Sequence, residues 1–403
     1  MVSIGIFLAA TLLFINMFGQ TIQTGIIYQE HRATATKTSD LLDNILLNPG
    51  TPNAWGTGGS TPVSFGIQDP EFTQYQLSPF SLMRLAPVGA DTFGYDKTSS
   101  VYTRLKTGLG GSLFMPQDAT LNYSQATKLL GVNGSYGFQL NIEPVVKISI
   151  TETQAAAPLT LAVRVSGTGF PLANAHIGYC LFPVTLPESE SEYPYYTAQN
   201  GTDETDGQGF VSLEFPDVTL DTQCYAFVVV ARVGGLAGIG YCSRVTSTDE
   251  YVVPMVDSLT EQRVLIAHSF DLNNSNPPFS SLKYTAAFFP SSILFTGGDC
   301  SPMTNQTGTL TSGVGNPYAS VAIPTYTPQI LVVVYEKSAS NGGIVLMPWG
   351  VSALAFPVTF GGDPSQQEWV ATDVRQVLVS AVPPLAYQAT LSVWSYQGRQ
   401  VIG

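Results

Sequence analysis

The chain has 403 residues, of which 44% are hydrophobic and only 11% are charged, with 38 glycines and 27 prolines. This length suits several domains, and the apolar content is that of a chain that folds around hydrophobic cores. The formal net charge is −13 and the 16 basic residues are mostly scattered singly, so no basic patch is expected to neutralise phosphates, which excludes nucleic acid as an expected partner.

The N-terminal segment reads "MVSIGIFLAATLLFINMFGQTIQTGIIYQE" and has no charged residue before Glu30. As a helix, residues 2–18 would be roughly 26 Å long, which is just enough to cross a hydrocarbon core of about 30 Å. The apolar spacing continues beyond residue 18, and no proline occurs before Pro49. The sequence therefore predicts one helix over residues 1–47 that inserts into a membrane or forms a filament core.

Two alternatives for this helix are a cleaved secretory signal and a permanent element. A signal peptide carries a basic n-region, and this chain has no Lys or Arg before Arg32, so the cleaved signal is disfavoured. Small and polar residues within the apolar stretch favour helix packing against helix over helix packing against lipid. The residues expected to pack in this way are Ile4, Phe7, Leu8, Leu12, Asn16, Gln20, Ile22 and Ile26.

The helix is expected to end in "LLNPGTPNAWG", because Pro49 cannot continue a helix and Gly50 readily adopts a positive φ. In "LNYSQATKLLGVNGSYGFQLNI", residues 123–130 have the pattern of a short helix closed by Gly131, and residues 136–142 alternate like a strand. Residues 48–148 are therefore predicted to form a small α+β unit.

Short strands dominate the rest of the chain, and their pattern repeats. "YCLFPVTL" is echoed by "AAFFPSSIL", and "FVSLEFP" by "YASVAIP". Two tandem antiparallel sandwiches are predicted, over residues 149–258 and 259–403, the second with extra strands in "EWVATDVRQVLVSAV" and "AYQATLSVWSY". The strands resemble immunoglobulin-like or carboxypeptidase-regulatory-like modules. The expected fold class is α+β, mainly β: a long helix, a small α+β unit and two sandwiches.

Cysteines and glycosylation motifs point to an exported protein. The cysteines are even in number and lack zinc-type spacing, so two disulfides are expected among Cys180, Cys224, Cys242 and Cys300. Five N-x-S/T motifs lie downstream of the helix, at Asn122, Asn133, Asn200, Asn273 and Asn305. Asn200 and Asn305 occupy equivalent loops of the two repeats and are expected to be the most accessible. The expected location is extracellular, at the cell surface.

No motif for catalysis or for a cofactor is recognised in the sequence. It has three histidines and no HExxH, GxSxG, P-loop or Rossmann pattern. The acidic segment "DETDGQG" fails the EF-hand spacing and is interpreted as a turn in preference to a cation site. The aromatic segment "EYPYY" could form a sugar-binding platform, although packing is the preferred interpretation. We expect no enzyme activity, no metal and no cofactor.

The first 145 residues resemble archaeal type IV pilin-like surface proteins. The resemblance rests on the uncharged N-terminal helix, its extension, "LLNPGTPNAWG", and "YSQATKLLGVNGSYGFQLNI". It implies a structural subunit that is membrane-inserted before assembly and then polymerises with copies of itself through the helix, with β-rich domains outside. Two departures are the absence of a basic leader before the helix and of the glutamate typical of bacterial pilins at the fifth position, where Gly5 stands.

Two rival functions remain open from the sequence. One is a solitary membrane-anchored protein whose sandwiches bind a cell-surface component or a glycan. The other is an exported hydrolase, which lacks a recognisable nucleophile and base. The surroundings of Ser3, Thr11, Asn16 and Gln20 distinguish a filament from an anchor, because lipid on all sides is costly for polar groups that a helical bundle can pair.

Overall fold

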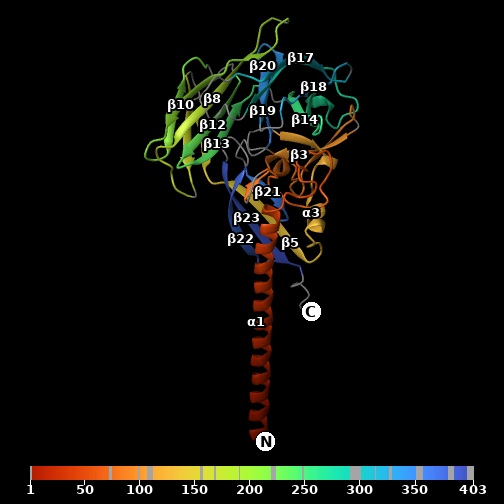
Figure 1. The fold of residues 1–403 in the computed structure, drawn as a ribbon, viewed down its shortest axis with the longest axis vertical. Coiled ribbons are helices and arrows are strands. Elements are labelled where there is room, and N and C mark those ends of the chain that lie inside the picture. Colours follow the sequence, from red (N-terminus) through yellow and green to blue (C-terminus); the bar gives the residue numbers. More distant parts are fainter. Residues whose placement is uncertain are drawn as a thin grey trace.

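The computed structural model describes residues 2–396 except for 72–74, 99, 107–111, 155–157, 168, 190, 219–223, 247–248, 291–300, 314, 326–328, 351–356 and 380–384. Within this part, the chain is mainly β, with one long N-terminal helix and several sheets gathered around the C-terminal end of that helix (Figure 1).

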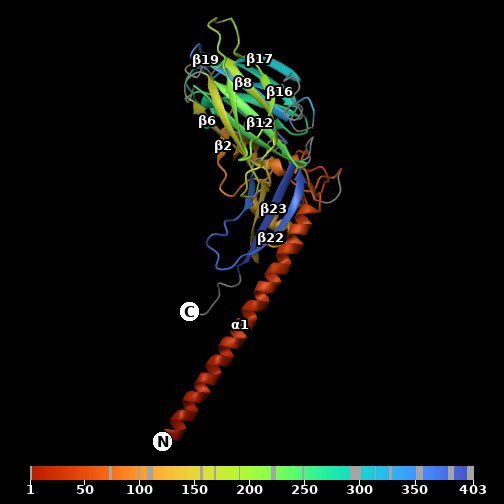
Figure 2. The same ribbon diagram turned by 90° about the vertical axis from the view of Figure 1, so that its left-hand side faces the viewer.

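Helix α1 (Val2–Leu46) is continuous over 45 residues, which confirms the predicted long helix. It ends shortly before Pro49, which cannot donate the next backbone hydrogen bond. Its last turns are held by the body of the protein, since Leu42 and Ile45 are fully buried. The remainder of α1 projects from the body as a single straight rod (Figure 2).

The end of α1 packs on a five-stranded sheet, here called the base sheet, with strand order β1-β22-β23-β5-β21. Its strands are β1 (Gln76–Leu77), β5 (Tyr136–Pro144), β21 (Val358–Gly361), β22 (Ala371–Val379) and β23 (Leu385–Ser395). Arg375 on β22 donates to the hydroxyl of Ser39 at 3.1 Å, and its Nε lies 3.3 Å from the carboxylate of Asp43. The rings of His31 and Trp369 stack at 4.0 Å. These contacts fix the helix to the sheet.

The base sheet corrects the prediction that the last strands extend the second sandwich. Strand β23 instead pairs with β5, in a register that runs from Tyr387 opposite Pro144 to Ser395 opposite Tyr136. Strand β22 then pairs with β23, and β21 with the other edge of β5. Alternating residues identified these segments as strands, but alternation carries no information about a partner more than 200 residues away.

Short elements complete the region after α1. They are α2 (Pro79–Met83), η1 (Gln117–Ala119) and α3 (Tyr123–Leu129). The predicted short helix is confirmed in α3, which begins with a capping box in which Asn122 and Gln125 each bond the other's backbone N–H. Gly131, with φ +66°, follows this helix as predicted.

The first sandwich has two sheets, with strand orders β11-β7-β6 and β10-β8-β12-β13. The strands are β6 (Lys147–Gln154), β7 (Leu159–Ser166), β8 (His176–Thr185), β9 (Tyr195–Tyr196), which pairs with the end of β8, β10 (Gln199–Glu204), β11 (Phe210–Phe215), β12 (Tyr225–Val233) and β13 (Leu236–Arg244). Leu161, Val163, Phe227 and Val229 are fully buried between the sheets. Apart from β9, the seven strands have an immunoglobulin-like arrangement.

The second sandwich repeats this strand order, as β18-β15-β14 and β17-β16-β19-β20. Its strands are β14 (Val252–Ser258), β15 (Arg263–His268), β16 (Ser281–Pro290), β17 (Thr304–Thr311), β18 (Tyr318–Ala322), β19 (Gln329–Ser338) and β20 (Asn341–Trp349), with η2 (Ser269–Asp271) after β15. Its β14 side is extended by β4 (Ser112–Pro116), β3 (Ser100–Lys106) and β2 (Thr92–Tyr95). The two sandwiches therefore share one topology.

The two sandwiches meet through corresponding sheets. Strands β12 and β19 are buried along nearly their whole length, which requires cover on both faces. The rings of Phe182 on β8 and Phe289 on β16, which are counterparts in the repeat, contact each other with centroids 5.2 Å apart. The sheets that contain β8 and β16 thus share a continuous apolar interface.

Membrane insertion of the N-terminal helix before assembly stays a prediction. Among the described residues, no helix combines the length and the apolar character that a bilayer crossing requires.

The prediction of two disulfides is also wrong for the described cysteines, since Cys180, Cys224 and Cys242 form none with one another. Cys180 lies opposite Val228 and Cys242 opposite Phe227, so their side chains point to opposite faces of one sheet. Cys224 shares the face of Cys180 but lies four residues from its partner Val228, roughly 13 Å along the strand, too far for a disulfide. Cys300 lies outside the described residues.

Candidate functional site

The largest unexplained surface is the projecting helix, defined as residues 7–28 of α1 (Figures 1 and 2). Its large apolar side chains are between 44% and 73% exposed. They are Phe7, Leu8, Leu12, Leu13, Phe14, Ile15, Met17, Phe18, Ile22, Ile26, Ile27 and Tyr28. Soluble monomers rarely leave so many contiguous apolar groups in water, so this surface indicates an interaction site.

The first half of the projecting helix is apolar on every side. Leu12, Leu13, Phe14 and Ile15 are consecutive, and at about 100° per residue four consecutive side chains surround the helix axis. A helix that is hydrophobic all round is normally enclosed by other structure. A flat partner would cover one side only, so several neighbours are needed to remove this segment from water.

The polar residues of the projecting helix are compatible with enclosure. The hydroxyl groups of Thr11, Thr21 and Thr24 donate to the backbone carbonyl four residues earlier, at 2.8–2.9 Å. Their hydrogen-bonding requirement is therefore met within the helix. Gly19 and Gly25 face open space, which allows another helix to approach the backbone closely.

The residues predicted to pack helix against helix are all on this element. Phe7, Leu8, Leu12, Asn16, Gln20, Ile22 and Ile26 are exposed, and the side chain of Ile4 lies outside the described residues. Sequence reasoning did not select Leu13, Phe14, Ile15 and Phe18, which are just as exposed. That reasoning followed the spacing of apolar residues along one face of the helix. A run of consecutive apolar residues should have indicated that the helix is apolar on every side.

The five predicted glycosylation sites, Asn122, Asn133, Asn200, Asn273 and Asn305, all have exposed asparagines. Asn200 and Asn305 lie in strands β10 and β17, not in loops as expected. They are nevertheless equivalent, because Asn200 pairs with Cys180 and Asn305 with Ala287, each two residues before the Phe of a Phe-Pro pair. Glycosylation itself stays a prediction.

The acidic segment "DETDGQG" begins in the last residues of β10 and continues into the turn before β11, as interpreted from its sequence. The carboxylate of Asp206 accepts hydrogen bonds from the backbone N–H groups of Gln208 and Phe210, at 2.8 and 2.9 Å. Within the described residues, no group of three or more His, Cys, Asp or Glu side chains is arranged to hold a metal. In the "EYPYY" segment, Tyr195 is exposed whereas the ring of Tyr196 packs on Phe182.

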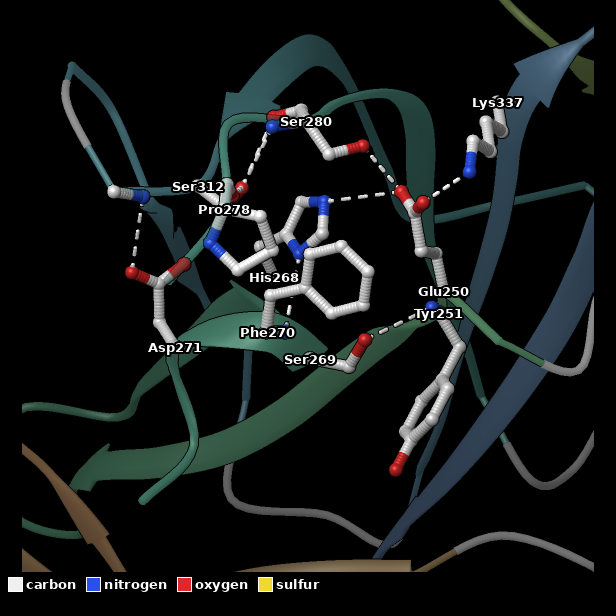
Figure 3. A network of polar contacts seen from close by, with 11 residues as sticks. Glu250, Tyr251, His268, Ser269, Phe270, Asp271, Pro278, Ser280, Ser312 and Lys337 are labelled. Atoms are coloured by element: carbon white, nitrogen blue, oxygen red, sulfur yellow. Dashed lines mark hydrogen bonds and ion pairs between the residues drawn. The ribbon is translucent and has the colours of Figure 1, made fainter. Parts of the chain in front are cut away.

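A buried polar network joins the segment between the sandwiches to the second sandwich (Figure 3). Glu250 is 5% exposed and accepts hydrogen bonds from Ser280 and Lys337. Nε2 of the fully buried His268 lies 3.8 Å from the same carboxylate, and its Nδ1 accepts from the N–H of Phe270 at 3.2 Å. Ser280 therefore contacts a carboxylate and not the histidine, so the network provides no serine–histidine pair for nucleophilic catalysis.

The charges in this network follow from its surroundings. Burial would raise the pKa of Glu250, but hydrogen bonds from Lys337 and Ser280 outweigh burial and lower it. Burial lowers the pKa of His268, and the Glu250 carboxylate offsets only part of that effect. At neutral pH the network therefore holds an ionised Glu250 beside a neutral His268.

We expect His268→Asn to reduce the loss of stability on acidification. Because the pKa of folded His268 is lowered, the unfolded chain binds its proton first as pH falls below about 6.5, and the free energy of unfolding decreases. Asn does not titrate and can still accept from Phe270. Glu250, Asp271 and Lys337 are present in both proteins. Denaturant unfolding at pH 7, 6 and 5 should show a smaller decrease for the variant; equal decreases would contradict this assignment.

Comparisons with known proteins identify no family. No family model and no curated protein match the chain. The crystal structure of red sea bream transglutaminase matches with 10% identity over 62% of this chain and 37% of that chain, at a TM-score of 0.18. The D0-D1 domain of intimin matches with 14% identity over 55% of this chain and 98% of that chain, at a TM-score of 0.20. The chain thus spans little over a third of the transglutaminase, and TM-scores this low do not establish a shared fold.

Proposed function

We propose that this protein is the structural subunit of a pilin-like extracellular filament, in which the projecting helices of many copies form the core and the β-sandwiches lie outside. The observation that carries the proposal is the projecting helix itself, which is uncharged, is apolar on every side in its first half and leaves its large apolar side chains exposed.

The partner in this proposal is a second copy of the chain. With 22 residues, the projecting helix is roughly 33 Å long, and a cylinder about 10 Å wide of that length has a lateral surface of roughly 1,000 Å2. A stable interface needs about 800 Å2 per partner, so a bundle of such helices offers sufficient area. Parallel copies are suited to this arrangement because every body lies at the same end of its helix (Figure 1).

The mode of attachment to the base sheet supports the same role. The end of α1 is fixed by fully buried Leu42 and Ile45 and by Arg375 with Asp43, so the body cannot easily fold back over the projecting helix. The extracellular location rests on the five exposed N-x-S/T asparagines and on the low charge of the chain. Enzyme activity forms no part of the proposal.

Sedimentation velocity of the full chain tests the proposed function. The protein would be purified in a mild detergent that shields the projecting helix, and the detergent would then be removed. We expect large, concentration-dependent polymers after removal and small species before it. A species that stays monomeric at all concentrations without detergent would overturn the proposal and favour the solitary binding protein.

A further inference from the structure

The projecting helix has two unlike faces in its second half, and their direction relative to the body follows from α1 itself. Eighteen residues of an α-helix make five turns, so a residue 18 positions before another lies on the same side of a straight helix. Figure 2 shows that α1 is straight. The buried end of α1 therefore indicates which side of the projecting helix lies under the body.

The side under the body carries amide groups. Six residues of α1 are at most 3% exposed against the body, namely Thr34, Thr38, Leu41, Leu42, Ile45 and Leu46. The residues five turns before them are Asn16, Gln20, Gln23, Thr24, Ile27 and Tyr28. Three of these six residues are amides, and Asn16, Gln20 and Gln23 form what is here called the amide face.

The opposite side is apolar. The residues Ala33, Thr36, Asp40 and Asn44 of α1 are exposed, and at about 100° per residue they lie on the side of the helix roughly opposite the residues buried against the body. The residues five turns before them are Ile15, Phe18, Ile22 and Ile26. All four are large and apolar, between 49% and 61% exposed, and together they form what is here called the back face.

We infer that the back face contacts the helices of other copies at the centre of the filament, and that the amide face points outward beneath its own body. This inference rests on the proposed function and adds the orientation of each subunit. Apolar side chains gain most from the water-free centre of a bundle, whereas an unpaired amide there would cost free energy. The body lies on the side opposite the back face, so it can remain outside the bundle without a clash.

The occupant of the back face is accordingly the helix of a second copy. A helix of the same sequence presents the same uncharged, apolar surface of sufficient area, and an assembly of copies places every body outside the bundle. On the amide face, Asn16, Gln20 and Gln23 can both donate and accept hydrogen bonds, so water or polar groups of neighbouring copies satisfy them. That face should tolerate substitution better than the back face.

Paired cysteine variants of the full chain test this orientation. Ile22→Cys and Gln23→Cys change adjacent residues whose side chains point about 100° apart. After assembly and mild oxidation, we expect Ile22→Cys to give at least about fivefold more disulfide-linked dimer than Gln23→Cys. The unsubstituted protein, treated in the same way, measures the dimer that the native cysteines form. Equal linking, or more linking through Gln23→Cys, would overturn the orientation.

A charge variant provides an independent readout. Gln20→Glu with Gln23→Glu adds two charges to the amide face, and we expect polymers to persist in sedimentation. Their loss would contradict the outward position of this face. The two hypotheses fail in different ways: wild-type protein that does not polymerise refutes the proposed function, whereas wild-type polymers that link better through Gln23→Cys refute only the orientation.

Discussion

Ile22→Asp with Ile26→Asp should abolish assembly and leave the body folded. Both isoleucines belong to the projecting helix and are about half exposed in the single chain, so the monomer loses little packing. In a helix bundle, each buried carboxylate would cost several kcal/mol, because it leaves water without a partner of opposite charge. Two such charges per subunit should weaken association by more than a thousandfold, which is about 4 kcal/mol.

Sedimentation velocity and far-UV circular dichroism, applied together, provide the measurement. The variant should sediment as a small species at every concentration and keep the β-rich spectrum of the wild type. Ile22→Val with Ile26→Val is the matched control, since it keeps the surface apolar and should still polymerise. An aspartate variant that assembles like the wild type would refute a bundle core built from this helix.

Arg84→Met should strongly destabilise the region that follows α1. Arg84 is fully buried, and its guanidinium donates to the carbonyl groups of Ala119 at 2.6 Å, Gly58 at 3.0 Å and Ser60 at 2.9 Å, and also to that of Trp55. It also lies 5.1 Å from the centre of the Trp55 ring. Methionine fills similar space but leaves four carbonyl groups without this donor. The carbonyl of Trp55 still accepts from the backbone N–H of Gly58, so at about 1–3 kcal/mol for each of the other three groups a total loss of at least about 3 kcal/mol is expected.

Denaturant unfolding followed by tryptophan fluorescence would measure this loss, because Trp55 is in contact with Arg84. Burial lowers the pKa of Arg84 to about 10, so the side chain remains charged at neutral pH. Arg84→Lys is the matched control, because it keeps the positive charge but loses the planar guanidinium with its several N–H donors. Its free energy of unfolding should lie between those of the wild type and Arg84→Met. A decrease below about 1 kcal/mol for Arg84→Met would show that water replaces the guanidinium readily.

Local pattern was sufficient to predict several elements of the fold. The long helix before Pro49, the short helix before Gly131 and the repeated sandwiches follow from apolar spacing, turn residues and the two Phe-Pro pairs. Each of these features depends on residues that are close in sequence. Helix capping and strand alternation act over a few residues, so they can be recognised without knowledge of the fold.

Features that depend on distant partners were not predictable in this way. The pairing of β23 with β5, the opposite directions of Cys180 and Cys242, and the carbonyl groups around Arg84 arise only when remote segments meet. The same holds for the two faces of the projecting helix. The amides at positions 16 and 20 were identified from sequence, but their direction became known only once Thr34 and Thr38 were seen to be buried.

Electron cryomicroscopy of wild-type assemblies tests the central claim most directly. The account predicts filaments with parallel α-helices at the centre, in which residues 7–28 pack against the same residues of neighbouring copies with the back face innermost, and with the base sheets and sandwiches outside. Assemblies held together by the β-sandwiches, with the helices extending into solvent or into detergent, would contradict the claim that this helix forms the core.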